Sequence, residues 1–153
     1  NTLFSTSAEW LGSDYSYSSV NTAVHWWIPI SHSLISGFRA EYQNLWGDAP
    51  FYLLPYITMR GIPVARYQGN TIALGETEWR WDFTSRFSLI GFAGAGKAVM
   101  DSDSWGDASW KASGGAGGRY LIARKLNLRM GMDVARGPEQ WAYYFVFGTS
   151  WVR

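Results

Sequence analysis

Residues 140–151 read Gln-Trp-Ala-Tyr-Tyr-Phe-Val-Phe-Gly-Thr-Ser-Trp, and this segment decides the fold that we expect for the chain. Side chains alternate between the two faces of a β-strand, so every second residue shares a face. One face here would carry the aromatic rings of Trp141, Tyr143, Phe145, Phe147 and Trp151. The other face would carry small or polar residues such as Ala142, Gly148 and Ser150. A soluble core normally mixes aliphatic and aromatic side chains, so this wall of rings predicts a strand whose outer face meets lipid.

The overall composition also favours a membrane barrel. The chain has 153 residues, 18% of them aromatic and ten of them tryptophan, yet its mean hydropathy is only −0.15. Alternation of lipid-facing and lumen-facing side chains gives this kind of average. The net charge of +1 argues against a nucleic-acid partner. With no cysteine and two histidines, we expect neither a disulfide nor a metal site, and no cofactor.

Seven further segments show strand-like alternation of side chains. They are residues 2–11, 15–28, 33–43, 70–82, 86–98, 110–122 and 126–135. In the third of them, Phe38 and Tyr42 would share one face, and Arg39 and Glu41 would share the other. With residues 140–151 as the eighth strand, we predict an all-β fold in which residues 1–153 form part or all of an antiparallel transmembrane β-barrel.

A long segment, residues 44–69, interrupts this series of strands. It contains Pro50, Pro55 and Pro63, and proline cannot donate a hydrogen bond within a central strand. The same segment is too rich in apolar side chains to be a disordered tail. We therefore expect a long loop that packs inside the protein or carries its function.

The connections between the predicted strands alternate in length. Short turns follow the second, fourth and sixth strands, whereas long connections follow the third and fifth. The turns after the first and seventh strands are short to medium, so the alternation is imperfect. One short-turned end and one long-looped end are typical of outer-membrane barrels. Tryptophans gather near the short-turn end, where such barrels carry an aromatic girdle; these are Trp26, Trp27, Trp79, Trp81 and Trp151. Alternating strands also form soluble sandwiches and lipocalin-like barrels, which remain the alternative fold.

Six short motifs follow one another in a particular order. Met59-Arg60-Gly61-Ile62 and Arg66-Tyr67-Gln68-Gly69 lie in the long loop, and Glu78-Trp79-Arg80-Trp81 lies in the strand after it. Phe92-Ala93-Gly94-Ala95-Gly96, Gly117-Gly118-Arg119-Tyr120 and Asp133-Val134-Ala135-Arg136-Gly137 follow. This order resembles the carboxy-terminal half of the outer-membrane assembly-factor superfamily, the bacterial surface-antigen barrels of the BamA and TamA type. The resemblance is clearest over residues 52–151, and the three earlier strands fit it by number only.

The resemblance implies a larger barrel than eight strands. Barrels of this family have sixteen strands, and five of them follow the long loop, as five do here. The chain would then supply the last eight strands. It also begins at Asn1, almost inside a strand pattern, and we expect it to be a segment of a longer polypeptide. A complete small barrel of eight strands stays open as the alternative.

The resemblance also assigns roles to residues. The long loop would fold into the barrel, with Met59, Arg60, Gly61 and Ile62 at its tip. Arg60 would reach carboxylates that face the lumen, and Glu76 and Glu78 share one predicted strand face. Arg80 lies on that face and could complete a ladder with Glu78. The remaining lumenal partners would be Gly94, Gly96 and Arg119.

The function implied by the resemblance is the insertion or translocation of outer-membrane clients through a lateral seam. Trp141, Tyr143, Phe145, Phe147, Gly148 and Trp151 would form one side of that seam. The partners would be the lipid bilayer and client proteins or other envelope subunits. The location would be the outer membrane of a Gram-negative bacterium. We expect no enzymatic activity and no catalytic residue.

Two departures from the family pattern qualify this reading. Gly94 stands where the family has Asp, and Ile62 replaces an aromatic residue after Arg-Gly. We therefore expect the loop to lack one anchor. Insertase activity could be lost in such a branch, which leaves a structural barrel subunit as one alternative. A small lipid-modifying barrel enzyme is a further one, but His32 and Ser33 are adjacent and would point to opposite faces.

Overall fold

The computed structural model is a single antiparallel sheet of eight strands, and it describes residues 1–7, 16–126 and 128–148. The strands are β1 (Thr2–Ser7), β2 (Tyr17–Pro29), β3 (Leu34–Gly47), β4 (Thr71–Asp82), β5 (Phe87–Val99), β6 (Lys111–Ala123), β7 (Leu128–Arg136) and β8 (Trp141–Phe147). Two 3-10 turns, η2 (Phe51–Leu53) and η3 (Arg124–Leu126), accompany them. No helix in these ranges is long and apolar enough to cross a membrane.

Each strand pairs with its neighbour in the chain, in the order β1 to β8. The predictions of an all-β fold and of eight antiparallel strands are therefore confirmed. Within the described residues β1 and β8 form the two edges, and the sheet is not closed. Most strand boundaries lie within two residues of those predicted, but β3 runs on to Gly47, four residues beyond the predicted end. Residues 8–11 of the first predicted strand and Trp151 of the last lie outside the described residues.

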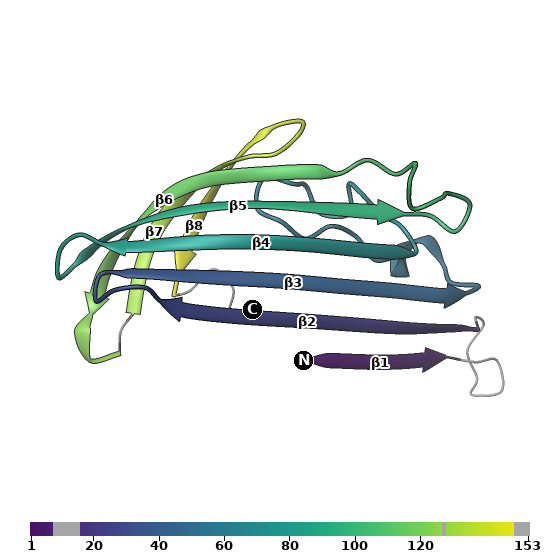
Figure 1. Cartoon of the computed structure of the whole chain (residues 1–153), viewed down its shortest axis with the longest axis horizontal. Helices are drawn as coiled ribbons and strands as arrows, with labels where there is room; N and C mark the ends of the chain where they lie inside the picture. Colours follow the sequence, from purple (N-terminus) through teal and green to yellow (C-terminus); the bar gives the residue numbers. More distant parts are fainter. Residues whose placement is uncertain (8–15, 127, 149–153) are drawn as a thin grey trace.

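The sheet is strongly curved and so has a concave and a convex face. In Figure 1, β1 to β5 lie side by side across the view, and β6 to β8 bend behind them. The connection between β3 and β4 is seen behind β4 and β5, inside the curve. Right-handed twist between neighbouring strands accumulates into such bending of a long sheet.

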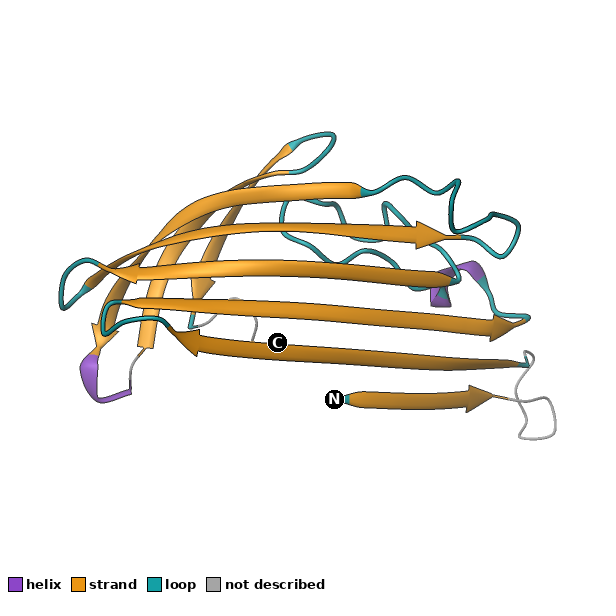
Figure 2. Cartoon of the chain, in the orientation of Figure 1, coloured by secondary structure: helices purple, strands orange, loops and turns teal. Residues whose placement is uncertain are grey.

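The connections sort by length to the two ends of the strands, as Figure 2 shows. Residues 30–33 and 83–86 form short turns at one end, and η3 lies in the third connection there. Residues 48–70 and 100–110 form the long connections at the other end. The predicted alternation is thus present from β2 to β7, but the connection from β7 to β8, residues 137–140, is short although it lies at the loop end. We refer below to the short-turn end and the loop end.

Aromatic rings gather on the convex face near the short-turn end. The rings of Trp81 and Phe83 lie 5.9 Å apart between centroids, those of Phe83 and Phe87 6.3 Å, and those of Phe87 and Tyr120 5.0 Å. This is a continuous row across β4, β5 and β6. Trp27, which we expected in the same girdle, stacks instead on His25 on the concave side, because it is one residue out of step with Trp26.

Candidate functional site

Residues 48–70 form a hairpin-like loop that lies on the concave face. The Ile57 amide donates to the Tyr67 carbonyl at 3.0 Å, and the Gly69 amide donates to the Pro55 carbonyl at 3.0 Å. These bonds hold the two arms of the loop together and leave residues 59–62 at its tip. The arms are fixed to the sheet by apolar packing, since Ile57, Met59 and Ile62 form one buried cluster with two residues of β4, Ile72 and Leu74. Burial of these side chains stabilises the folded-back position of the loop.

Arg60 at the loop tip is almost completely buried and lies among three carboxylates. Its Nη2 is 2.7 Å from Glu78 Oε2, its Nη1 donates to Asp133 Oδ2 at 3.2 Å, and its Nε is 3.9 Å from Glu76 Oε1. The guanidinium also lies over the ring of Phe92, 3.5 Å from its centroid. A buried guanidinium is stable only when its charge is paired, so these contacts fix the loop tip between β4 and β7.

Asp133 on β7 joins two arginines. It is fully buried and accepts two hydrogen bonds from Arg119 of β6, at 2.5 Å from Nη1 and 2.8 Å from Nη2. This bidentate geometry is the strong form of an arginine–carboxylate pair. Because Asp133 Oδ2 also accepts from Arg60, this carboxylate links the loop tip to the wall of the sheet.

Arg39 on β3 extends the network to the arm of the loop. Its Nη1 donates to Glu76 Oε2 at 2.7 Å and to the Thr58 carbonyl at 3.0 Å, and its Nη2 donates to Thr58 Oγ1 at 2.8 Å. Its Nε donates to Glu41 at 3.0 Å. The network therefore ties residues 58 and 60 of the loop to β3, β4, β6 and β7.

Gly61 makes a backbone approach that no larger residue permits. Its φ is +87°, and a Cβ placed on it would lie 2.9 Å from the amide nitrogen of Gly137. Its own amide donates to the Tyr144 hydroxyl of β8 at 2.8 Å. The loop tip is thus joined to the last strand, and glycine is required by both the left-handed conformation and the close contact.

Gly94 leaves room for Glu76. A Cβ at this position would lie 2.6 Å from Glu76 Cγ and 3.0 Å from the sulfur of Met59. Gly96 similarly faces Ile57, whose Cγ2 would lie 3.1 Å from an added Cβ. Gly94 has no side chain that could anchor the loop, and Arg60 takes its carboxylate partners from two other strands, through Glu78 and Asp133.

Arg80 does not join this network. It shares a face with Glu76 and Glu78, as expected, but the described contact of its Nε is with Asp82 Oδ1, at 3.4 Å, and not with Glu78. Glu78 is engaged by Arg60 instead. The predicted Glu78–Arg80 ladder is therefore replaced by two separate groups of charges along the same face.

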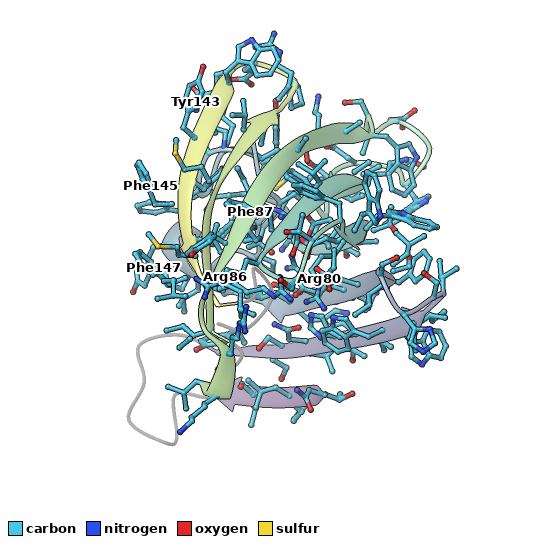
Figure 3. All side chains as sticks on the ribbon, turned by 90° about the vertical axis from the view of Figure 1, so that its left-hand side faces the viewer. Arg80, Arg86, Phe87, Tyr143, Phe145 and Phe147 are labelled. Carbon is cyan, nitrogen blue, oxygen red and sulfur yellow. The ribbon has the colours of Figure 1, made fainter. Side chains whose placement is uncertain are left out.

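The aromatic residues of β8 that were expected to form a seam point away from the concave face. Figure 3 shows Tyr143, Phe145 and Phe147 on the outside of the curve, and the exposed fractions of these side chains are 68%, 75% and 69%. Trp141 is exposed on the same side. Gly148 follows the strand with φ +83°, so β8 ends at Phe147. Within the described residues, β8 pairs only with β7, which leaves its other edge open.

A second contact joins the loop to the β7–β8 turn. Arg66 Nε lies 2.9 Å from both oxygens of Glu139, and the Tyr67 hydroxyl donates to Glu139 Oε1 at 2.7 Å. The hydrogen bonds from Tyr67 and then Arg66 hold the pKa of Glu139 below its ordinary range. The hydrogen bond to Glu139 correspondingly raises the pKa of Tyr67 and that of Arg66.

Several residues of the site were not assigned a role from the sequence, among them Arg39, Phe92, Asp133 and Tyr144. Alternation does place Arg39 and Asp133 on the polar faces of their strands, so the face was predictable but the partners were not. Tyr144 lies in an aromatic segment, and only its step out of phase with Tyr143 marks it as facing inward.

The arrangement is suited to holding a loop in place. Within the described ranges, no group of three or more His, Cys, Asp or Glu side chains could hold a metal ion. His32 and Ser33 both lie in the turn between β2 and β3, where the Ser33 amide donates a hydrogen bond to Ser31 Oγ at 3.3 Å. No protein-family model matches the sequence, and no curated protein matches it significantly.

Proposed function

We propose that this chain is the carboxy-terminal part of an outer-membrane β-barrel that helps to insert or translocate client proteins. The observation that carries the proposal is the opposition of the two faces of one sheet. The convex face exposes rings such as Trp81 and Phe145, and the concave face buries Arg60, Asp133 and their partners under a folded loop. Alternation of apolar outward and polar inward side chains is the pattern of a membrane barrel.

The row of rings near the short-turn end supports the membrane part of the proposal. Trp81, Phe83, Phe87 and Tyr120 form a band at one level of three neighbouring strands. Aromatic side chains favour the boundary between headgroups and hydrocarbon, where a ring can be buried while a polar atom stays wet. In a soluble protein, the same surface would be an unusually large exposed apolar patch.

The open edges of β1 and β8 define how the barrel would be completed. Unpaired backbone groups at a sheet edge are too costly to leave in hydrocarbon. In the proposed barrel of sixteen strands, eight further strands of a longer polypeptide pair with these edges. If instead β1 pairs with β8, the barrel has eight strands. Disulfide trapping distinguishes the two, because residues 1–153 contain no cysteine that could compete: a Ser5–Tyr144 cysteine pair would crosslink only in the smaller barrel.

The proposed mechanism uses the edge of β8 as a seam. An exposed strand edge can pair with an incoming strand through backbone hydrogen bonds, and such pairing is tolerant of sequence. A client strand would be held there while it enters the bilayer. Tyr144 connects this strand to the loop tip through its hydrogen bond with Gly61, so loop and seam are mechanically joined.

A photocrosslinking experiment in living cells tests this mechanism. A photoreactive amino acid at Tyr143 or Phe145 should capture nascent outer-membrane proteins, and the same group at Val64 in the loop serves as the matched control. Adducts that form only from Val64 would exclude the seam. Depletion of the protein should lower the levels of many outer-membrane proteins.

A structural barrel subunit is the second candidate. It is favoured by the number of contacts that hold Arg60 and its neighbours at the loop tip. A loop tip held by Glu78, Asp133 and the Tyr144 hydroxyl lacks an evident means of opening. In that case depletion would remove one envelope complex and leave the remaining outer-membrane proteins at normal levels.

A further inference from the structure

A second group of charges lies on the concave face at the short-turn end, beyond the Arg60 network. It consists of Arg80 and Asp82 on β4, Ser88 on β5 and Arg129 on β7. Figure 3 looks onto this end of the sheet and shows Arg80 inside the curve, opposite the side on which Phe145 and Phe147 lie. We call these four residues the rim cluster.

The contacts of the rim cluster converge on one oxygen atom. Asp82 Oδ1 accepts a hydrogen bond from Ser88 Oγ at 2.5 Å, and it lies 3.4 Å from both Arg80 Nε and Arg129 Nη1. Arg129 Nη1 also donates to Ser88 Oγ. A single carboxylate therefore serves two guanidinium groups, and the cluster carries one surplus positive charge.

Each arginine has an Nε donor that forms no hydrogen bond with the described residues, and the Nε of Arg80 has only the ion-pair contact with Asp82 Oδ1 at 3.4 Å. Arg80 Nε and Arg129 Nε are both shielded from solvent. A shielded guanidinium N–H normally has an acceptor, because its desolvation is otherwise uncompensated. The clusters of Arg39 and Arg119 follow that rule, with each guanidinium donating to at least one carboxylate.

The neighbouring acids cannot fill the role of acceptor. Glu78, the other carboxylate two residues from Arg80 on β4, is engaged by Arg60 Nη2 at 2.7 Å. Asp133 is bound by Arg119 and Arg60. The described turns of this end contain Arg86, Arg124 and Lys125 and no acidic residue. An anion that approaches the short-turn end thus meets a positive field.

We propose that the rim cluster binds an oxyanion of the phosphate class, which accepts hydrogen bonds from Arg80 and Arg129 together. Guanidinium forks match phosphate oxygens, and tetrahedral oxygens can serve two forks at once. The side chains remain reachable, since Arg80 is 24% exposed, Asp82 22% and Arg129 13%. The group could be a free phosphate or the headgroup of a lipid. The site depends only on these side chains, so it stands apart from the proposed assembly function.

The direct test is nuclear magnetic resonance of the arginine Nε–Hε groups in the full chain, folded in neutral detergent micelles. Addition of inorganic phosphate should shift the Arg80 and Arg129 signals together, with one shared dissociation constant. The Arg66 signal is the internal control, because its Nε is already bound to Glu139 on the opposite end of the molecule. Equal shifts at Arg66, or no saturable shift at Arg80, would overturn the proposal.

Substitutions separate a specific site from a general positive field. Arg80→Lys and Arg129→Lys keep the charge but remove the Nε donor, and each should weaken phosphate binding by about tenfold or more. Arg86→Lys is the matched control at the same end, and it should leave the affinity unchanged. Equal affinity of R80K, R129K and R86K contradicts the site. Should R129K fail to fold, R80K and the wild-type titration still decide.

Two further measurements define the ligand. Asp82→Asn removes the carboxylate that competes with phosphate for the two arginines, so it should tighten phosphate binding. The arginine substitutions should weaken binding, and a purely structural role for the cluster does not produce these opposite effects. Short-chain phosphatidic acid, compared with short-chain phosphatidylcholine, distinguishes a lipid source from free phosphate. If both phosphate and phosphatidic acid shift the two signals, the site is open to headgroups; a response to phosphate alone assigns it to a soluble anion.

Discussion

The two faces of β4 have little in common, although they alternate residue by residue along one strand. Glu76 and Glu78 point to the concave face, where each lies beside an arginine from another element. Trp79 and Trp81 point to the convex face, where 42% and 51% of their surface stays exposed. The concave face is stabilised by paired charges, so its stability depends on particular partners. The convex face has no such partners, and its stability depends on the medium that contacts it.

Loss of the Asp133 carboxylate should lower the free energy of unfolding more than any other substitution considered below, because it disrupts the paired charges of the concave face. Asp133→Ala leaves the buried guanidinium groups of Arg60 and Arg119 without their shared carboxylate. An uncompensated buried charge costs about 3–5 kcal/mol. Urea unfolding in micelles, followed by tryptophan fluorescence, measures the loss. Asp103→Ala in the exposed β5–β6 loop is the control and should change the stability by less than about 0.5 kcal/mol. Comparable stability of the two variants would contradict the role given to Asp133.

A charge on the convex face should be nearly as damaging, but only in a bilayer. Phe145→Lys is expected to destabilise the protein by about 2–4 kcal/mol if this position lies near the membrane midplane. Phe51→Lys is a matched control, because Phe51 has 76% of its surface exposed and Phe145 has 75%, yet Phe51 lies in the loop. The stabilities of the two variants are compared by folding each into lipid vesicles at a series of denaturant concentrations. Equal stabilities would show that the convex face meets water.

A smaller loss of stability is expected from a substitution at the point where the loop tip contacts the sheet. Gly61→Ala introduces a Cβ at φ +87° and against the Gly137 backbone. A non-glycine residue held in this region costs about 1–3 kcal/mol. The loop should therefore detach more often, which protease cleavage within residues 48–70 reports. Gly106→Ala is the control, since the nearest atom to its added Cβ is 3.9 Å away. Unchanged cleavage of G61A would mean that the loop is held by its arms alone.

The contrast between the faces also explains what could be predicted from the sequence. A strand is a local pattern of period two, so residues such as Arg39, Phe38 and Trp81 could be assigned to faces without knowledge of their neighbours. The partners of Arg60 could not be assigned in this way, because Asp133 is 73 residues distant in the chain. Their meeting depends on the curvature of the whole sheet. Alternation also places Glu78 and Arg80 on one face and so predicts that they pair, whereas Glu78 pairs with Arg60 and Arg80 contacts Asp82.

The smallest expected effect is a pH dependence of the contact between the loop and the β7–β8 turn. Arg66, Tyr67 and Glu139 form this contact, which we call the exposed clamp. Because the pKa of Glu139 is held below its ordinary range, the clamp is complete above that range and weakens as the pH falls below it. The pKa of Tyr67 is raised, so its contribution is complete below the ordinary tyrosine range and is lost as the pH rises through the higher value. Hydrogen exchange of the Gly69 amide, whose acceptor is the Pro55 carbonyl, can follow both limbs once it is corrected for the intrinsic pH dependence of exchange.

Two variants show which residue causes the change in Gly69 exchange at acid pH, the acid limb, and which causes the change at alkaline pH, the alkaline limb. Glu139→Gln should remove the acid limb, since an amide does not titrate, and Tyr67→Phe should remove the alkaline limb while leaving the acid limb to Glu139 and Arg66. High salt should flatten the acid limb, because an exposed ion pair is screened at high ionic strength. The Arg60 network lies buried under the same loop, so Gly61 exchange should respond to salt far less than Gly69 exchange. Equal salt responses at the two amides would mean that the loop opens as one unit, with the buried charges and the exposed clamp released together.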